Sequence, residues 1–246
     1  MRPLAPIVWR DATVREVIEE TPRARTLVLD VPGWPGHVAG QHLDVRLTAE
    51  DGYQASRSYS IASAPEDGLV AITVEELVDG EVSPYLVQEV RAGDGFEVRG
   101  PVGGHFTWSV ERGGPLLLVG GGSGAVPLMA MLRHNAARDG DGDVRTLLSA
   151  RSLEDLLYRE ELERLGERDG VDVQITLTRS WPRRWRGHSR RVDAEMLAAV
   201  GPPPASAPHI YVCGPTAFVE TVADLLVQLG HVPRTIRAER FGPTGA

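Results

Sequence analysis

Polar and apolar residues alternate in short runs along roughly the first hundred positions, which is the pattern of half-buried β-strands. Turn-forming stretches such as residues 32–36, Pro-Gly-Trp-Pro-Gly, separate these runs. The predicted strands are residues 13–18, 25–31, 41–47, 53–63, 69–77 and 95–99. A short helix over residues 83–90 interrupts them. Six short strands with turn signals between them predict a small antiparallel β-barrel.

The pattern changes after Gly113-Gly114-Pro115 to strands that alternate with helices. The predicted strands are residues 116–119, 144–150, 171–177, 210–213 and 235–239, and the predicted helices are residues 125–138, 153–167, 193–200 and 217–229. This alternation is typical of an α/β domain with a parallel sheet. We therefore expect two domains, the barrel over residues 1–112 and the α/β domain over residues 113–246.

A glycine loop follows the first strand of the predicted α/β domain. Residues 120–124 read Gly-Gly-Gly-Ser-Gly, and a helical pattern starts at Ala125. Free amides at a helix N-terminus and the missing Cβ atoms favour an anion such as a pyrophosphate. The dinucleotide fingerprint G-x-G-x-x-G is only partly met, because Pro127 stands where the third glycine would be. From the loop alone, a tight turn without a ligand stays open as the alternative.

Composition limits the classes of function. A formal net charge of −8 argues against general nucleic-acid binding. No apolar run approaches the ~20 residues needed to cross a bilayer, and the N-terminus lacks a signal-peptide core, so we expect a cytoplasmic protein. The single cysteine, Cys213, leaves no ligand set for an iron–sulfur cluster, and the scattered histidines do not predict a metal site.

A cation, an aromatic ring and a hydroxyl lie close together in the predicted strand 53–63. Strand alternation places Arg57 and Tyr59 on one side and Ser60 on the other. Such a set suits a phosphate, a flat heterocycle and one hydrogen bond. Taken alone, an ordinary surface strand with an Arg–Tyr pair is the simpler interpretation.

Five short motifs in one order make the chain resemble the ferredoxin–NADP reductase family. They are R-x-Y-S at Arg57, Tyr59 and Ser60, G-x-x-S-x-x-L at Gly80, Ser83 and Leu86, G-P-x-G at Gly100, Pro101 and Gly103, the glycine loop through Pro127, and C-G-P at Cys213, Gly214 and Pro215. The resemblance spans nearly the whole chain. It implies that the barrel binds FAD and that the α/β domain binds a nicotinamide dinucleotide.

The resemblance assigns the FAD contacts to residues of the barrel. It implies that Arg57 pairs with a flavin phosphate, that Tyr59 lies against the isoalloxazine ring and that Ser60 hydrogen-bonds near the flavin N5. Ser83 suits a helix N-cap beside the pyrophosphate, a role compatible with that of an ordinary cap. The other barrel residues expected to bind the cofactor are Thr73, Val74 and Gly80.

The resemblance assigns the nicotinamide dinucleotide to two turns of the α/β domain. Its pyrophosphate would face Gly122, Ser123, Gly124 and Pro127. Its nicotinamide would lie beside the turn formed by Cys213, Gly214 and Pro215. A lone cysteine at the end of a buried strand is equally well interpreted as a small core residue.

The C-terminal segment Glu239-Arg240-Phe241 partly matches the E-x-Y ending of plant-type family members. By this resemblance Phe241 stacks on the flavin, and Glu239 joins Ser60 and Cys213 as a catalytic residue. The alternative is that Glu239 is simply solvated, as a glutamate near a chain end normally is.

The end of the second α/β strand bears on the choice between NADPH and NADH. A carboxylate there favours NAD, whereas arginine favours a 2′-phosphate. The chain offers Ser149 and Arg151 and no acid until Glu154, and an arginine-rich stretch that includes Arg179 and Arg191 follows. We expect NADPH. Two alternatives stay open for the arginines: a solvated loop, or a docking surface for an acidic electron-transfer protein.

The sequence therefore predicts an FAD-dependent NAD(P)H oxidoreductase. It would pass a hydride from NADPH or NADH to N5 of FAD, and then pass electrons to a separate ferredoxin, flavodoxin or oxygenase component. One alternative is a flavin reductase that uses diffusible flavin. Another is a non-catalytic electron-transfer subunit of a larger complex. The sequence does not predict the acceptor, the pathway or the oligomeric state.

Overall fold

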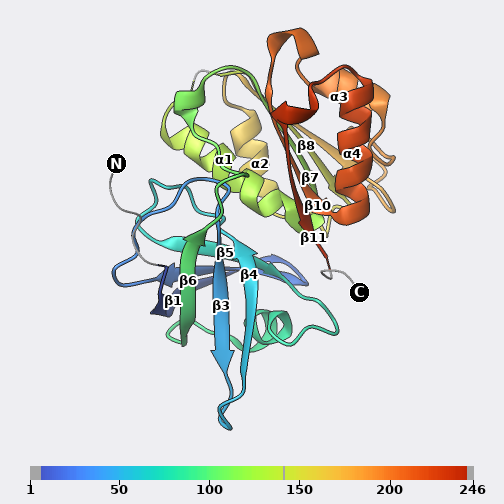
Figure 1. The fold of residues 1–246 in the computed structure, drawn as a ribbon. Coiled ribbons are helices and arrows are strands. Elements are labelled where there is room, and N and C mark those ends of the chain that lie inside the picture. The colour runs from blue at the N-terminus through green and yellow to red at the C-terminus, as the bar shows by residue number, and fades with distance from the viewer. Residues whose placement is uncertain (1–6, 141, 243–246) are drawn as a thin grey trace.

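The computed structural model describes residues 7–140 and 142–242 and shows two domains, one above the other (Figure 1). Residues 1–6, 141 and 243–246 lie outside the described residues, and residues 1–6 are part of the stretch expected to lack a signal peptide. In the described part of the chain, no helix is both long and apolar enough to span a membrane.

Residues 9–102 form an antiparallel barrel, which confirms the predicted fold class of the first domain. The strand order is β4-β3-β6-β1-β2-β5, and every pair is antiparallel. An isolated antiparallel bridge between Ile61 and Ile72 joins the two ends of this sheet and closes the barrel. The strands are β1 (Trp9–Thr21), β2 (Ala24–Asp30), β3 (His42–Thr48), β4 (Gln54–Ser60), β5 (Val70–Glu75) and β6 (Gly95–Val102).

A short helix covers one end of the barrel core. The predicted helix is present, with residues 85–89 forming the π-helical turn η1 (Tyr85–Glu89). Its buried residues Leu86 and Val87 pack into the same apolar cluster as Leu27, Leu43 and Ile72 of the strands. The segment between β5 and η1 is thereby fixed beside β4, the strand that carries Arg57, Tyr59 and Ser60.

Residues 116–241 form the predicted α/β domain around a parallel sheet. The strand order is β11-β10-β7-β8-β9. The strands are β7 (Leu116–Gly121), β8 (Val144–Ala150), β9 (Val171–Leu177), β10 (His209–Pro215) and β11 (Ile236–Phe241). The helices are α1 (Ala125–Ala137), α2 (Arg159–Gly166), α3 (Ala194–Val200) and α4 (Thr216–Gln228). The boundary that we expect between residues 112 and 113 lies in the connection from β6 to β7 and stays a prediction.

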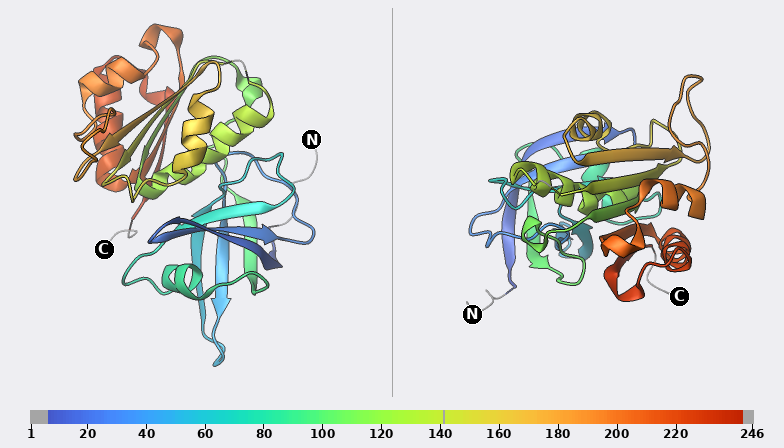
Figure 2. Two further views of the ribbon diagram at one scale, coloured as in Figure 1. Left: turned by 180° about the vertical axis from the view of Figure 1, so that it is seen from behind. Right: turned by 90° about the horizontal axis from the view of Figure 1, so that it is seen from above.

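The helices cover both faces of the parallel sheet. Apolar side chains of α1 and α2 pack on one face, and those of α3 and α4 pack on the other (Figure 2). The first cluster also contains small barrel residues such as Ala24, Ala39, Ala62 and Ala71, so α1 packs against the barrel as well as the sheet. One continuous core therefore joins the two domains on this side.

The predicted helix over residues 153–167 was too long. The structure has turns over residues 152–158, and α2 begins only at Arg159. Tyr158 has the left-handed backbone conformation, with φ of 58°, which interrupts a helix. Its buried hydroxyl donates to Thr73 of β5. A contact between the domains therefore prevents the earlier start of this helix.

Candidate active site at the seam between the domains

The carboxyl ends of β7 and β10 lie side by side where the strand order of the parallel sheet reverses. Ligands bind in such crevices in open α/β sheets. These strand ends, with that of β11, face β3, β4 and β5 of the barrel, and we call this zone the seam. The predicted glycine loop and the Cys213 turn both lie in the seam.

The glycine loop is packed directly against the Cys213 turn. A Cβ added to Gly124 would lie 2.1 Å from the carbonyl oxygen of Cys213, and one added to Gly214 would lie 3.0 Å from the carbonyl oxygen of Gly121. Glycine is therefore required at Gly124 and Gly214 by the packing of two backbone turns. This requirement exists whether or not a ligand binds.

Gly122 differs from its neighbours because it faces open space. It has a left-handed backbone with φ of 55°, and the nearest atom to an added Cβ is Oε2 of Glu75 at 3.9 Å. A small cavity lined in part by Arg23, Gly122, Ser123 and Asp155 opens here. The first turn of α1, which includes Pro127, follows directly and has no side-chain cap. Exposed amides and a missing Cβ fit a dinucleotide pyrophosphate.

The R-x-Y-S residues of β4 differ strongly in exposure. Arg57 is exposed, and its Nη2 lies 2.7 Å from Oε2 of Glu81. Tyr59 packs against the barrel core but stays partly exposed, and burial raises the pKa of its hydroxyl. Ser60 is buried, and among the described residues its Oγ has no hydrogen-bond partner. Buried hydroxyls normally have partners, so the unpaired Oγ of Ser60 fits a hydrogen bond to a ligand such as a flavin.

Ser83 does not act as the predicted helix cap. Its Oγ accepts a hydrogen bond of 3.0 Å from the backbone N–H of Leu77, and no side-chain cap is present at η1. A Cβ added to Gly80 would lie 2.8 Å from this Oγ. The G-x-x-S spacing is therefore explained by a tight loop that Ser83 holds together, and the sequence prediction of a cap was wrong.

Thr73 and Val74 of β5 have side chains that are already engaged within the protein. Oγ1 of Thr73 lies 2.7 Å from Oγ1 of Thr26 and also accepts from the hydroxyl of Tyr158. Val74 is fully buried in the barrel core. Contacts of these two residues with a cofactor therefore have to come from their backbone atoms, and their place in the cofactor site stays a prediction.

Glu239 and Cys213 are paired in register on neighbouring strands β11 and β10. Cys213 is fully buried, and burial together with the nearby Glu239 raises the pKa of its thiol, which stays neutral. Burial also raises the pKa of Glu239 to about 7. Among the described residues, Oε2 of Glu239 has no hydrogen-bond partner. Glu239 is thus a partly buried carboxyl with one buried oxygen, where the alternative was a solvated side chain.

The alternation of β11 turns three of its side chains toward the barrel. Ile236 and Ala238 pack with α3 and α4, whereas Phe241 packs with the cluster that contains Tyr211 and Cys213. Arg237 lies over the ring of Tyr211, at 5.3 Å from the ring centre. Glu239 and Phe241 therefore lie on the same side of the sheet as Cys213.

The barrel contributes His42 to the same place. His42 is the register partner of Ser60 on the neighbouring strand, and its Nδ1 lies 3.9 Å from Oε1 of Glu239. Burial lowers the pKa of His42, and the carboxylate of Asp44 partly opposes this. The structure thus brings together the three predicted catalytic residues, Ser60, Cys213 and Glu239, with a fourth side chain that sequence reasoning missed.

The residues expected to recognise the dinucleotide ribose continue from the same sheet edge. Ser149 is the register partner of Gly121. The backbone N–H of Arg179 donates to the carbonyl of Arg151 at 2.9 Å, so these two arginines are adjacent. Arg191 is exposed and follows Arg190, whose carbonyl accepts from Thr176 of β9. All three arginines therefore lie beyond the carboxyl ends of β8 and β9.

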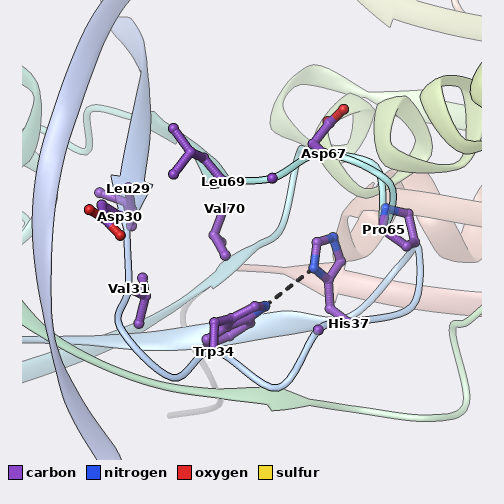
Figure 3. Close-up of a pocket in the computed structure, with 11 residues that line it drawn as sticks. Leu29, Asp30, Val31, Trp34, His37, Pro65, Asp67, Leu69 and Val70 are labelled. Carbon is purple, nitrogen blue, oxygen red and sulfur yellow. Dashed lines mark hydrogen bonds between the residues drawn. The ribbon is translucent and has the colours of Figure 1, made fainter.

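A separate cavity in the barrel contains none of these residues. It lies between the loop after β2 and residues 65–70 (Figure 3). Nε1 of Trp34 donates to Nδ1 of His37 at 3.4 Å, and Nε2 of His37 lies 3.1 Å from the carbonyl oxygen of Ser63. The imidazole is thus engaged on both sides by the protein itself, so we do not assign this cavity to the active site.

Sequence reasoning missed His42, Glu75 and Tyr158 at the seam. The polar face of β3, formed by His42, Asp44 and Arg46, is the signal that would have pointed to His42. It becomes informative only when the register with Ser60 is known. Glu75 and Tyr158 have no comparable signal, because each is placed by contacts between the domains.

Two family models match separate parts of the chain. One, described as an oxidoreductase FAD-binding domain, matches residues 12–108. The other, described as an oxidoreductase NAD-binding domain, matches residues 118–224. The first match contains the R-x-Y-S residues, and the second contains the glycine loop and the Cys213 turn.

Curated relatives and solved structures agree with these matches. The chain is 32% identical to ferredoxin–NADP reductase B of Sorangium cellulosum, covering 98% of this chain and 94% of that protein. It is 31% identical to the glycine betaine monooxygenase reductase subunit of Pseudomonas aeruginosa, covering 93% of this chain but only 63% of that protein's length. The FAD/NAD-binding domain of nitric oxide dioxygenase from Vibrio cholerae has a TM-score of 0.84 at 27% identity, covering 95% of this chain and 99% of that one.

Proposed function

Because the chain belongs to the ferredoxin–NADP reductase family, we propose that it is an NAD(P)H-dependent flavoprotein reductase that moves a hydride from NADPH to N5 of FAD. The electrons then go to a separate acceptor. The observation that carries this proposal is the meeting of Ser60, Cys213 and Glu239 at the seam, where two buried polar atoms lack partners among the described residues. The residues present therefore fit a flavin and a dinucleotide.

Each half of the seam has a distinct task in this reaction. When bound, FAD accepts the hydride and stores the electron pair. In this proposal Arg57 would hold a phosphate of FAD, Tyr59 would support its ring, and Ser60 would donate a hydrogen bond to it. The open backbone at Gly122 and Ser123 holds the dinucleotide pyrophosphate. Holding both partners in one orientation is the main catalytic contribution of the protein.

Cys213 and Glu239 act on the reacting edge in different ways. The neutral, buried thiol of Cys213 provides an apolar contact that excludes water. Glu239 holds or releases a proton at its carboxyl, because its raised pKa of about 7 lets both forms exist near neutral pH. Phe241, on the same side of β11, covers the neighbouring surface.

The preference for NADPH is supported by charge at the ends of β8 and β9. Arg151 and Arg179 are adjacent and exposed; Arg151 follows β8, whose end lies next to the glycine loop, and Arg179 follows β9, the next strand of the sheet. A 2′-phosphate pairs with arginine, whereas a free ribose hydroxyl needs an acceptor such as a carboxylate. The Arg151→Ala variant should therefore raise KM for NADPH and leave KM for NADH unchanged. Arg168→Ala is the matched control, since Arg168 binds Asp139 after α1.

The acceptor is proposed to be a small redox protein or an oxygenase component. Relatives include the glycine betaine monooxygenase reductase subunit and ferredoxin–NADP reductase B, which supports transfer to a protein acceptor. Cys213 is the one cysteine of the chain and is buried, so this chain offers no cysteine ligand set for a cluster, and a bound flavin would supply the electrons to the acceptor.

Anaerobic mixing with NADPH and with NADH tests the proposal. The flavin absorbance near ~450 nm should bleach, and faster with NADPH than with NADH. Failure of both dinucleotides to bleach the flavin would remove the proposed function. Loss of all colour on gel filtration would favour the diffusible-flavin alternative. Failure of the reduced protein to turn over a dye acceptor would favour the non-catalytic subunit.

A further inference from the structure

We propose that His42 is a positioning residue for Glu239, and that the two side chains share one proton across the seam. The pair would set the protonation of the carboxyl beside Ser60 and give its proton a route to solvent. This inference rests on the proposed function, because it deepens the role of Glu239 in that reaction. Its experimental test does not require turnover.

Two strand pairs from different domains create this arrangement. His42 and Ser60 are register partners on β3 and β4, and Glu239 and Cys213 are register partners on β11 and β10. The contact of 3.9 Å between Nδ1 of His42 and Oε1 of Glu239 joins the two pairs. This is an ion-pair distance, and a closer approach by about 1 Å makes it a hydrogen bond.

The two carboxyl oxygens of Glu239 have different surroundings. Oε1 is the atom nearest His42, whereas Oε2 is buried and lacks a hydrogen-bond partner among the described residues. The Oγ of Ser60, next to His42 in the sheet, lacks one as well. Glu239 therefore has one oxygen toward His42 and a second that is free for the reacting site.

His42 is the ionisable group best placed to exchange a proton with Glu239. On β11, Arg237 lies over Tyr211, and on β10 the neutral thiol of Cys213 is the neighbour. On β3, Asp44 faces His42 but is bonded to Arg99 and Ser58. Within the described ranges, Glu239 makes its ion-pair contact with His42. The side chains of this pair are 26% and 24% exposed, so the imidazole reaches solvent.

The shared proton moves without any other bond changing. The Glu239 carboxyl loses its O–H bond and the His42 imidazole gains an N–H bond, which gives a carboxylate beside an imidazolium. Burial raises the pKa of Glu239 to about 7 and lowers the pKa of His42. The separation of 3.9 Å between the two groups means that, once the proton has moved, the opposite charges attract and favour the transferred form. Opposing effects of this kind make the two groups titrate as one coupled pair.

The test is an NMR titration of the FAD-loaded, full-length protein. Ring nitrogen signals of His42 are followed from pH ~5.5 to ~9 in the wild type and in Glu239→Gln. A coupled pair should give His42 a two-step curve in the wild type, and one step in the variant with its midpoint lower by about one pH unit. His231, which follows α4, should be unaffected in the same spectra. A His42 curve that Glu239→Gln leaves unchanged would overturn the inference.

The reciprocal experiment follows the Glu239 carboxyl carbon in His42→Gln. Removing the imidazole should raise the pKa of Glu239 by about one unit, because the carboxylate loses its cation. An unchanged titration contradicts the shared proton. If His42→Gln does not fold, the Glu239→Gln comparison decides alone. A flavin that NADPH fails to bleach overturns the proposed function but leaves these titrations valid, so the two failures can be told apart.

Discussion

The two sides of the seam differ in how their polar groups are satisfied. On the side of α1 and α2, the hydroxyl of Tyr158 donates to Thr73, Nη1 of Arg133 donates to the carbonyl of Ala62 at 2.8 Å, and Nδ1 of His134 lies 2.9 Å from Glu66. On the side of β10 and β11, Ser60 and Glu239 each leave a buried oxygen without a partner among the described residues, and on the first side Nε1 of Trp108, which packs on His134, also lacks one.

This difference separates the structural contacts between the domains, which we call the joint, from the candidate active site. Native proteins rarely leave buried polar groups unpaired, so two of them in one place indicate a function. Contacts on the α1 and α2 side fix the position of the two domains relative to each other, and the candidate site on the β10 and β11 side depends on that position. Substitutions on the first side should therefore affect stability, and those on the second should affect catalysis.

Ser60→Ala should have the largest effect of the changes considered. Loss of the hydroxyl should slow NADPH-dependent flavin reduction about 100-fold, which is the scale of one placed catalytic group. The urea midpoint should not change, because the Oγ of Ser60 has no partner among the described residues. Stopped-flow absorbance gives the rate. Ser58→Ala, which removes an exposed hydroxyl bonded to Asp44, is the control, and equal rates in the two variants would contradict the assignment.

The stability of the protein should depend on pH through Glu239. Its pKa is raised from 4.5 to about 7 in the folded state, so the folded protein binds more protons than the unfolded chain between these values. Stability should therefore fall as pH rises from 4.5 to 7, by at most about 3 kcal/mol. Urea unfolding of Glu239→Gln should lack this fall. Glu163→Gln, at an exposed pair with Arg159, should retain this fall. If the unfolding free energies of the wild type and Glu239→Gln change in parallel with pH, the raised pKa of Glu239 is contradicted.

Tyr158→Phe should affect the joint rather than the catalytic side. Removal of the hydroxyl that donates to Thr73 should lower the free energy of unfolding by about 1–2 kcal/mol. The rate of flavin reduction should stay nearly the same. Urea unfolding and stopped-flow mixing on one preparation measure both. Tyr85→Phe removes an exposed hydroxyl and should change neither. A Tyr158→Phe variant with wild-type stability and slow flavin reduction would contradict the assignment of Tyr158 to the structural side of the seam.

Glu81→Gln should have the smallest effect. The side chains of Arg57 and Glu81 are both 52% exposed, whereas those of Arg133 and Glu161 in the joint are 20% and 27% exposed. An exposed pair contributes less than about 1 kcal/mol, so freeing Arg57 for a flavin phosphate should tighten FAD binding by up to about fivefold. Fluorescence titration measures Kd. Weaker binding would mean that Glu81 orients Arg57 instead of competing with the phosphate.

The sequence predicted the strands well where the pattern is local. The predicted ranges 144–150 and 171–177 coincide with β8 and β9. Residues 144–150 are mostly buried, and residues 171–177 of the edge strand alternate apolar and polar side chains, so both patterns can be recognised locally. The helix over residues 153–167 failed because Leu156 and Leu157 are buried in turns rather than in a helix. The left-handed Tyr158 is fixed by the barrel, and no local pattern encodes that contact.

The candidate site could be predicted only as far as motifs are contiguous. Gly122 and Cys213 were found because each lies in a short turn with a recognisable residue order. His42 was missed because its contact with Glu239 depends on the register of two separate sheets. Ser83 was given the wrong role because the same spacing suits a helix cap and a loop held by the N–H of Leu77.

The close approach of Gly124 to the carbonyl of Cys213 has a mechanical consequence. Two turns whose backbones are already in contact cannot shift independently, so they move as one rigid block. A movement of the α/β domain away from the barrel would therefore move the glycine loop and the thiol of Cys213 together. Under the proposed function, the spacing between the pyrophosphate and the nicotinamide of the dinucleotide would therefore be fixed by Gly124 and Gly214.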